Sequence, residues 1–261
     1  MQRKSFFSRK YLVAATLAAT SFALALPAVA DTFSVQYFKA VTGSPDFYNG
    51  VNVPIGVSNN YVTSALGPDG LPVFNPSFTA TSGSVLAPNS AYINGANELL
   101  YWTPGSGPAG QTIQSDGTGS VALSSTPVTM FPPGYSNDAT YEETAILTGY
   151  FTVLSGQTDT VTFNVGADDT AFVYVDQSLV ESLGGIHGDT PAPSDTVTYG
   201  AGIHEIQIFY ADRDVTQAAL SFTDDGNFTV VPTTTPEPGS LFLLGSGLLG
   251  IAGAARRKFR S

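Results

Sequence analysis

Short stretches of alternating apolar and polar residues recur between turn-forming residues in the second half of this 261-residue chain. In 160–165, Thr-Val-Thr-Phe-Asn-Val, residues Val161, Phe163 and Val165 fall on one face of an extended chain. The same alternation runs through 204–210, and 171–175 is apolar enough to be buried on both faces. A period of two is typical of β-strands, and the region between the two ends of the chain shows no period of 3.6 residues. We therefore predict an all-β fold, an antiparallel sandwich or barrel.

Turn signals and apolar runs give the expected order of the other elements. We expect a hairpin turn at Asp176-Gln177-Ser178, because Asp, Gln and Ser there separate two apolar stretches. Further strands are expected at 33–41, 98–102 and 218–222, and long loops over 79–90 and 105–125. Tyr101 and Trp102 could stack on a sugar ring, but an aromatic pair in a strand more often belongs to the core.

The first 30 residues have the organisation of a secretory signal peptide. Four basic residues precede an apolar stretch at 11–26, and the small residues Ala28-Val29-Ala30 then offer a cleavage site before Asp31. The apolar stretch is shorter than the roughly 20 residues that a membrane span needs. We therefore predict a signal helix that is removed, and a mature chain that begins outside the cytoplasm.

The C-terminal end carries a second targeting pattern. Pro236-Glu237-Pro238 is followed by an apolar run at 241–255 and then by a basic cluster that includes Arg256 and Arg257. A basic cluster stays cytoplasmic, which leaves the upstream chain on the other side of the membrane. This tail resembles the PEP-CTERM sorting signal of bacteria that make exopolysaccharide. The resemblance implies recognition by an exosortase, a transient C-terminal membrane helix and removal of the tail; a plain C-terminal anchor is the alternative.

Charge and the absence of cysteine narrow the possible functions. Residues 31–235 contain two basic residues, Lys39 and Arg213, and twenty acidic ones, which gives a formal net charge of −18. Such a body does not bind nucleic acid through its phosphates, and it attracts divalent cations. Because there is no cysteine, disulfides, thiolate catalysis and cysteine-ligated metals are excluded, and the fold depends on its own core.

Few residues are candidates for chemistry. The sequence contains no Gly-x-Ser-x-Gly elbow, and its histidines are His187, in a glycine-rich loop, and His204, on the apolar face of a strand. We expect His204 in the core, and a structural role for His187 before a catalytic one. Arg213 lies between Asp212 and Asp214, which we interpret as an exposed ion pair.

Asp168 and Asp169 form the most informative pair. Two adjacent carboxylates follow a predicted strand, where their charges repel each other. A bound cation would relieve this repulsion, and hard oxygen ligands favour Ca²⁺. A turn with two solvated carboxylates is the other interpretation.

Several blocks of the mature chain form a further pattern: 44–47, 65–74, 130–133, 166–176, 179–180, 183–187, 201–204 and 208–213. Together they resemble the fibro-slime domain, a bacterial relative of the protective-antigen-type β-sandwich. The resemblance implies that Asp168 and Asp169 bind calcium at one end of the sandwich, and that the calcium helps to hold a glycan. Two positions depart from the pattern: Ser182 replaces a usual acidic residue, and Ala171-Phe172 replaces a usual aromatic one.

The expected organisation is a signal peptide at 1–30, a sandwich domain at 31–231, a Thr/Pro stalk at 232–235 and the sorting signal at 236–261. The leading hypothesis is a non-catalytic, calcium-dependent carbohydrate-binding or adhesion module, with Asp168, Asp169 and His187 at its site. It would be exported to the cell surface or extracellular matrix, with exopolysaccharide or a biofilm as its setting. The alternatives are a structural matrix protein without a ligand and, last, a glycosidase with two carboxylates.

Overall fold

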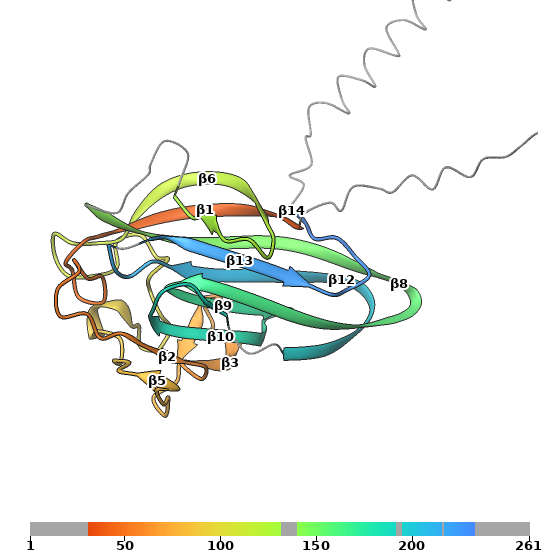
Figure 1. Ribbon diagram of the computed structural model, residues 1–261, viewed down its shortest axis with the longest axis horizontal. Helices are drawn as coiled ribbons and strands as arrows, with labels where there is room; N and C mark the ends of the chain where they lie inside the picture. Colours follow the sequence, from red (N-terminus) through yellow and green to blue (C-terminus); the bar gives the residue numbers. More distant parts are fainter. Residues whose placement is uncertain (1–30, 132–139, 192–194, 216, 233–261) are drawn as a thin grey trace, which may run out of the picture.

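The computed structural model describes residues 31–131, 140–191, 195–215 and 217–232. Nearly all of its regular structure is β-strand (Figure 1). The elements are β1 (Asp31–Val41), β2 (Gly56–Ser58), β3 (Val62–Leu66), β4 (Pro72–Phe74), β5 (Ser82–Gly83), the 3₁₀ helix η1 (Ser90–Tyr92), β6 (Gln114–Leu123), β7 (Val128–Thr129), β8 (Tyr141–Asp168), β9 (Thr170–Val175), β10 (Ser178–Ile186), β11 (Thr190–Pro191), β12 (Asp195–Ala211), β13 (Ala219–Asp224) and β14 (Val231–Pro232).

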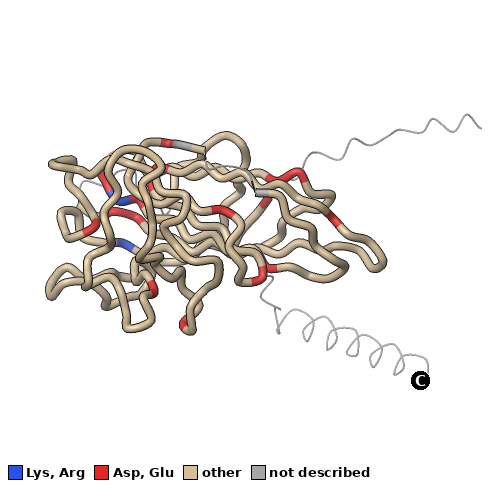
Figure 2. The backbone as a smooth tube through the Cα atoms, turned by 90° about the horizontal axis from the view of Figure 1, so that it is seen from below, with Lys and Arg blue, Asp and Glu red and all other residues tan. Residues whose placement is uncertain are grey.

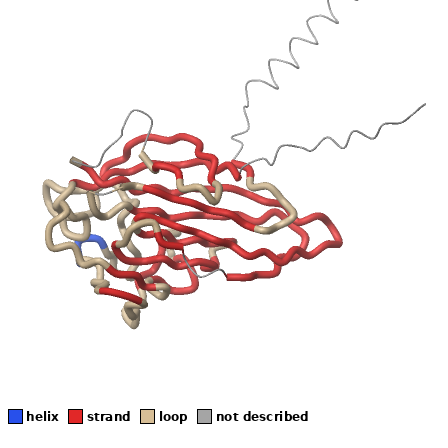
Figure 3. The backbone as a smooth tube through the Cα atoms, in the orientation of Figure 1, coloured by secondary structure: helices blue, strands red, loops and turns tan. Residues whose placement is uncertain are grey.

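The strands join in the order β4-β3-β10-β9-β12-β8-β1-β6, and the named strands pair antiparallel. At the centre, β12 runs beside β8 from Ala211↔Thr144 to Asp195↔Phe163, with one irregularity between Gly200 and Gly202. Strands cover most of the molecule, and loops gather at one end of it, where the 3₁₀ helix also lies (Figure 3).

The 28-residue strand β8 belongs to both layers of a sandwich. Its first half pairs with β1 and its second half pairs with β13. Phe33 of β1 meets Phe222 of β13 edge-on, with ring centroids 5.5 Å apart, so the two halves face each other across a shared apolar core. The predicted all-β sandwich is confirmed. The core includes Phe33, Val35, Leu147, Phe151, Val161, Phe163, Val165, Val173, Ile206, Ile208, Leu220 and Phe222.

A second apolar core lies on the other face of the β1, β8, β12 and β9 layer. Phe38, Phe172 and Phe209 project from this layer against aromatic residues of the segment 42–113. We call this segment the loop layer. Trp102, 2% exposed, donates from Nε1 to the Tyr210 carbonyl oxygen at 2.7 Å, and Tyr101 is fully buried. Both aromatic residues therefore belong to the core, as expected.

The predicted strands at 33–41, 160–165 and 171–175 all form, within β1, β8 and β9. The turn at Asp176-Gln177 also forms, with both residues at positive φ. The strand expected at 98–102 is wrong, because Glu98 and Leu99 make only isolated bridges. The loop expected over 105–125 is also wrong, since 114–123 forms β6, an edge strand that pairs with β1 and is mostly exposed. Exposure on both faces explains why its sequence, QSDGTGSVAL, shows no alternation.

The two ends of the chain lie outside the described residues. This applies to the predicted signal helix at 1–30, to stalk residues 233–235 and to the C-terminal membrane helix within 236–261. Between 31 and 232, no described helix is long and apolar enough to cross a membrane.

Candidate functional site

Three segments bring acidic residues together at one end of the sandwich. Asp168 ends β8 and Asp169 links it to β9, Asp189 follows β10, and Asp214 follows β12. The strand register explains this convergence, because Ala211 at the end of β12 pairs with Thr170 at the start of β9. We call these four residues the acidic cluster.

Asp169 is fixed by two backbone amides. Its Oδ1 accepts a hydrogen bond from the His187 amide and its Oδ2 accepts one from the Arg213 amide, each at 2.8 Å. The side chain is 2% exposed. Burial raises the pKa of the Asp169 carboxyl above its usual range, and the neighbouring Asp168 raises it further, against the lowering effect of the two amides. The two amides therefore hold the Asp169 side chain in one orientation. Burial of its carboxylate makes the charged form less favourable.

Asp168 faces the other acidic residues of the cluster. Burial raises the pKa of its carboxyl, and the charges of Asp189 and Asp214 add to this, while hydrogen bonds from the Asp169 side chain and the Asp189 backbone lower it. The peptide bond that joins Asp168 to Asp169 is cis. Both carboxyls thus sit where a positive charge would be favourable.

Arg213 does not form the exposed ion pair that the sequence predicted. It is 3% exposed, its Nε donates to the Asp46 carbonyl oxygen at 3.0 Å, and its guanidinium lies 5.3 Å from the centre of the Tyr101 ring. Its Nη2 is 4.0 Å from Asp46 Oδ1. The prediction failed because it used only the sequence neighbours of Arg213, whereas its partners lie more than 100 residues away in the loop layer.

The loop at 43–51 forms a hollow of about 350 Å³ beside this end of the molecule. Two backbone amides attach the loop to the residues that follow β12. The Tyr48 amide donates to the Arg213 carbonyl oxygen at 2.8 Å, and the Gly50 amide donates to the side-chain oxygen Oδ1 of Asp214 at 2.8 Å. In Figure 2, the two basic positions of the described chain lie close to acidic positions, and both are at the same end of the molecule. The hollow and the acidic cluster are therefore joined through Asp214.

The structure brings the three predicted site residues together, in unequal roles. His187 holds Asp169 through its backbone amide, while its side chain is 4% exposed with Nδ1 3.0 Å from the Gly188 carbonyl oxygen. Burial lowers the pKa of the His187 imidazole, which favours the neutral ring. The other histidine, His204, is half-buried and stacks on Phe151, and its Nδ1 lies 2.7 Å from Asp176.

The sequence did not indicate that Asp189 and Asp214 lie in the acidic cluster. Neither residue lies in a motif, and only the pairing of β12 with β9 shows that Asp214 belongs beside Asp168. In the described part of the chain, no three His, Asp or Glu side chains are already arranged to hold a metal ion by themselves.

Comparisons with solved structures find only remote likenesses. The chain is similar to the PA14 sugar-binding domain from an RTX adhesin (16% identity, 77% of this chain and 95% of that one, TM-score 0.32). It is also similar to the PA14 domain of the MpAFP antifreeze protein (12% identity, 78% and 93%, TM-score 0.31) and to an anti-sigma factor domain-containing protein (13% identity, 79% of each, TM-score 0.35). No curated protein matches the sequence. Scores this low carry no argument about function, and the fibro-slime resemblance is not confirmed.

The C-terminal resemblance has firmer support. The model of the PEP-CTERM protein-sorting motif matches residues 234–258. Pro236, Glu237, Pro238, Arg256 and Arg257, the predicted motif residues, fall within this range and outside the described residues. The chain thus carries a PEP-CTERM sorting motif, which marks it as an exported protein that an exosortase recognises and that is sorted to the cell surface.

Proposed function

We propose that this exported protein is a non-catalytic carbohydrate-binding or adhesion module whose acidic cluster holds Ca²⁺ and, through it, a glycan. The observation that carries the proposal is the convergence of Asp168, Asp169, Asp189 and Asp214 at one end of the sandwich, with the first two buried. The setting would be the extracellular matrix, with exopolysaccharide or a biofilm around it.

The donor set suits calcium. Carboxylate oxygens are the hard ligands that Ca²⁺ prefers, and a bound cation would offset the repulsion between the charges of Asp168 and Asp169. The two amides that hold Asp169 leave its orientation fixed before any ion arrives. Asp168 and Asp169 would hold the ion, and oxygens of the backbone, of water or of a sugar would complete its coordination. A calcium ion bound there would also accept sugar hydroxyl oxygens as ligands.

The adjoining loop offers space for a ligand. The hollow at 43–51 is lined by Asp46, Tyr48 and Asn49 among others, which provide an aromatic ring and hydrogen-bonding groups. Because Gly50 is hydrogen-bonded to Asp214, a sugar bound through the cluster would lie next to this loop.

The alternative is a structural matrix protein without a specific ligand. The net charge of −18 between residues 31 and 235 supports it, since such a body is soluble and repels copies of itself unless a cation intervenes.

The test is calcium titration of the full-length protein by calorimetry after treatment with a chelator, followed by glycan-array binding with calcium and with the chelator. We expect calcium binding, and glycan binding that the chelator abolishes. Asp168→Asn should weaken both at least tenfold while the thermal midpoint in chelator stays close to that of the wild type.

The matched control is Asp69→Asn, which removes one exposed carboxylate in the turn between β3 and β4. It should bind calcium as the wild type does. Calcium binding that is unchanged in Asp168→Asn would refute the ion site. No binding of either ligand, together with calcium-dependent self-association in light scattering, would favour the structural alternative.

A further inference from the structure

One face of the β1, β8 and β12 layer changes from apolar to polar along the length of its strands. Towards the acidic cluster, the residues that point to this face are apolar and covered by the loop layer: Phe38, Phe209 and Ala211. Further along the same strands, the same face presents Ser34, Gln36, Thr148, Tyr150 and Glu205, none of which belongs to either core. The opposite face remains apolar throughout, with Phe33, Leu147 and Ile206 in the first core. The polar half of the face is thus a distinct surface, where the loop layer ends.

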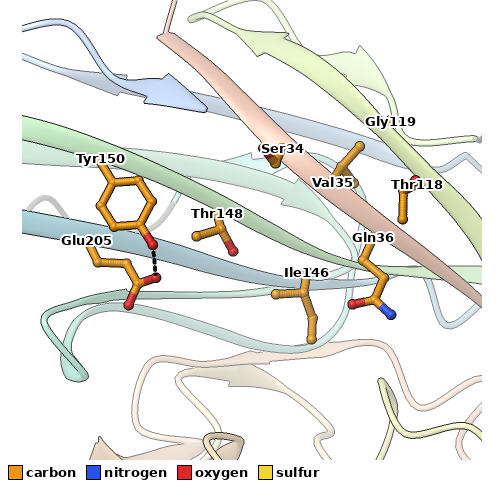
Figure 4. A pocket seen from close by; sticks show the side chains of 9 residues that line it. All are labelled: Ser34, Val35, Gln36, Thr118, Gly119, Ile146, Thr148, Tyr150 and Glu205. Carbon is orange, nitrogen blue, oxygen red and sulfur yellow. Dashed lines mark hydrogen bonds between the residues drawn. The ribbon is translucent and has the colours of Figure 1, made fainter. Parts of the chain in front are cut away.

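This surface is hollow. Its lining residues enclose about 550 Å³, a volume in the range of small-molecule sites. They come from four neighbouring strands: Thr118 from β6, Gln36 from β1, Ile146, Thr148 and Tyr150 from β8, and Glu205 from β12. Gln36, Ile146 and Glu205 project to the same side of the sheet (Figure 4). We call this surface the sheet groove.

The Tyr150 ring is held in a fixed place in the groove. Tyr150 and Glu205 are register partners on β8 and β12, and the Tyr150 hydroxyl donates to Glu205 Oε1 at 2.7 Å. This hydrogen bond raises the pKa of the Tyr150 hydroxyl further above neutral pH, in agreement with its role as the donor. The arrangement fixes a flat aromatic surface, and the second oxygen of Glu205 points away from Tyr150 (Figure 4).

The chemistry of the lining indicates what the groove accepts. Hydroxyl, amide and carboxylate groups beside an aromatic ring and Ile146 match a ligand with many hydroxyls and apolar C–H faces. None of the described lining residues is Lys or Arg, and Glu205 is acidic, so an anionic polymer would be repelled. Four strands at a spacing of about 4.8 Å extend over about 14 Å, which suits several sugar rings rather than one.

We propose that the sheet groove is a second binding site, which takes a neutral polysaccharide chain without calcium. The groove and the acidic cluster are separate: Glu205 lies six residues before Ala211 on β12, or about 20 Å away along the strand. Binding in the groove therefore does not depend on the function proposed for the acidic cluster.

The experiment is affinity electrophoresis of the full-length protein in native gels that contain a neutral β-glucan, dextran, neutral galactomannan or, as the anionic comparison, polygalacturonate. We expect a neutral polymer to retard the wild type equally with calcium and with a chelator. Tyr150→Ala should raise the dissociation constant at least tenfold, and Glu205→Gln should raise it severalfold. Asp168→Asn should leave it unchanged, which separates the groove from the calcium site.

The control for a surface change in β12 is Ile203→Ala, since Ile203 is 73% exposed and does not line the groove. Thermal midpoints of all variants would show that they fold. Retention that is unchanged in both Tyr150→Ala and Glu205→Gln, retention lost with the chelator, or retardation by polygalacturonate alone would each overturn the proposal. So would a complete lack of retardation by the neutral polymers.

Discussion

Glu143 makes the stability of the protein depend on pH in a direction opposite to that of an ordinary paired carboxylate. Its side chain is 2% exposed, and Oε2 has no hydrogen-bond partner in the described structure. Burial raises the pKa of this carboxyl from 4.5 to about 8; Asp116 adds to the rise, and Lys39, paired with Asp116 at 2.7 Å, opposes it. The folded state therefore binds the Glu143 proton more tightly than the unfolded state does. The resulting stabilisation is complete below about pH 4.5 and is lost as the pH rises to about 8.

The size of the effect follows from the two pKa values. At 1.36 kcal/mol per pH unit, the full effect between pH 5 and pH 8 is about 3.5 kcal/mol, and solvent screening near the Lys39 ion pair reduces our expectation to about 2 kcal/mol. Glu143→Gln is neutral at every pH, so it should lose that part of the pH dependence. The assay is urea unfolding at pH 5, 6, 7 and 8 with a chelator present, and Asp69→Asn serves as the control for the loss of one negative charge. A variant whose free energy of unfolding falls as steeply as that of the wild type would refute the reasoning.

Three further predictions concern the cores and the acidic cluster. Phe222→Ala removes a ring that packs against both Phe33 and Phe163, and we expect it to lower the free energy of unfolding by about 3–5 kcal/mol in urea titrations; a loss below about 1 kcal/mol would contradict a shared core. Trp102→Phe leaves the buried Tyr210 carbonyl without its indole donor and should cost about 1–3 kcal/mol in the same measurement, whereas an unchanged midpoint would contradict the role of that hydrogen bond. Calcium affinity, measured by calorimetry, should fall at least tenfold from pH 7 to pH 5, because protons compete for carboxyls with raised pKa values in the cluster, and equal affinities would argue against binding there.

The sequence predicted the strands that contribute to the first core. Residues 160–165 alternate because one face of β8 is buried and the other is exposed at that point. Residues 171–175 show no alternation because β9 lies between the two cores, with Val173 in one and Phe172 in the other. The local pattern of apolar and polar residues is sufficient to predict a strand where successive residues are buried according to the pleat of that strand.

The loop layer and the edge strand could not be predicted in the same way. In the loop layer, burial depends on distant contacts, such as those of Tyr61 with Phe172 and of Trp102 with Phe209, and these leave no period in the sequence. The edge strand β6 is exposed on most of its length, so its residues need not be apolar.

The candidate site was predictable only in part. Adjacent carboxylates at Asp168 and Asp169 were visible in the sequence, and their position at the end of a strand was correct. The approach of Asp214, and the burial of Arg213 against Asp46, depend on how β12 pairs with β9 and on where the loop layer folds back. Both depend on contacts between residues far apart in the chain, which cannot be predicted from the spacing of residues in the sequence.

The short strand β14 determines how a mechanical load would enter the domain. Val231 pairs with Tyr150 of β8, and the Thr32 amide at the start of β1 donates to the Val230 carbonyl oxygen at 3.1 Å, so the chain enters and leaves the domain side by side. A pull on the chain beyond Pro232 would first peel this two-residue strand from β8. The long pairing of β8 with β12 would bear the force only afterwards. Under a load applied at this end, β14 would detach first while both apolar cores stay closed.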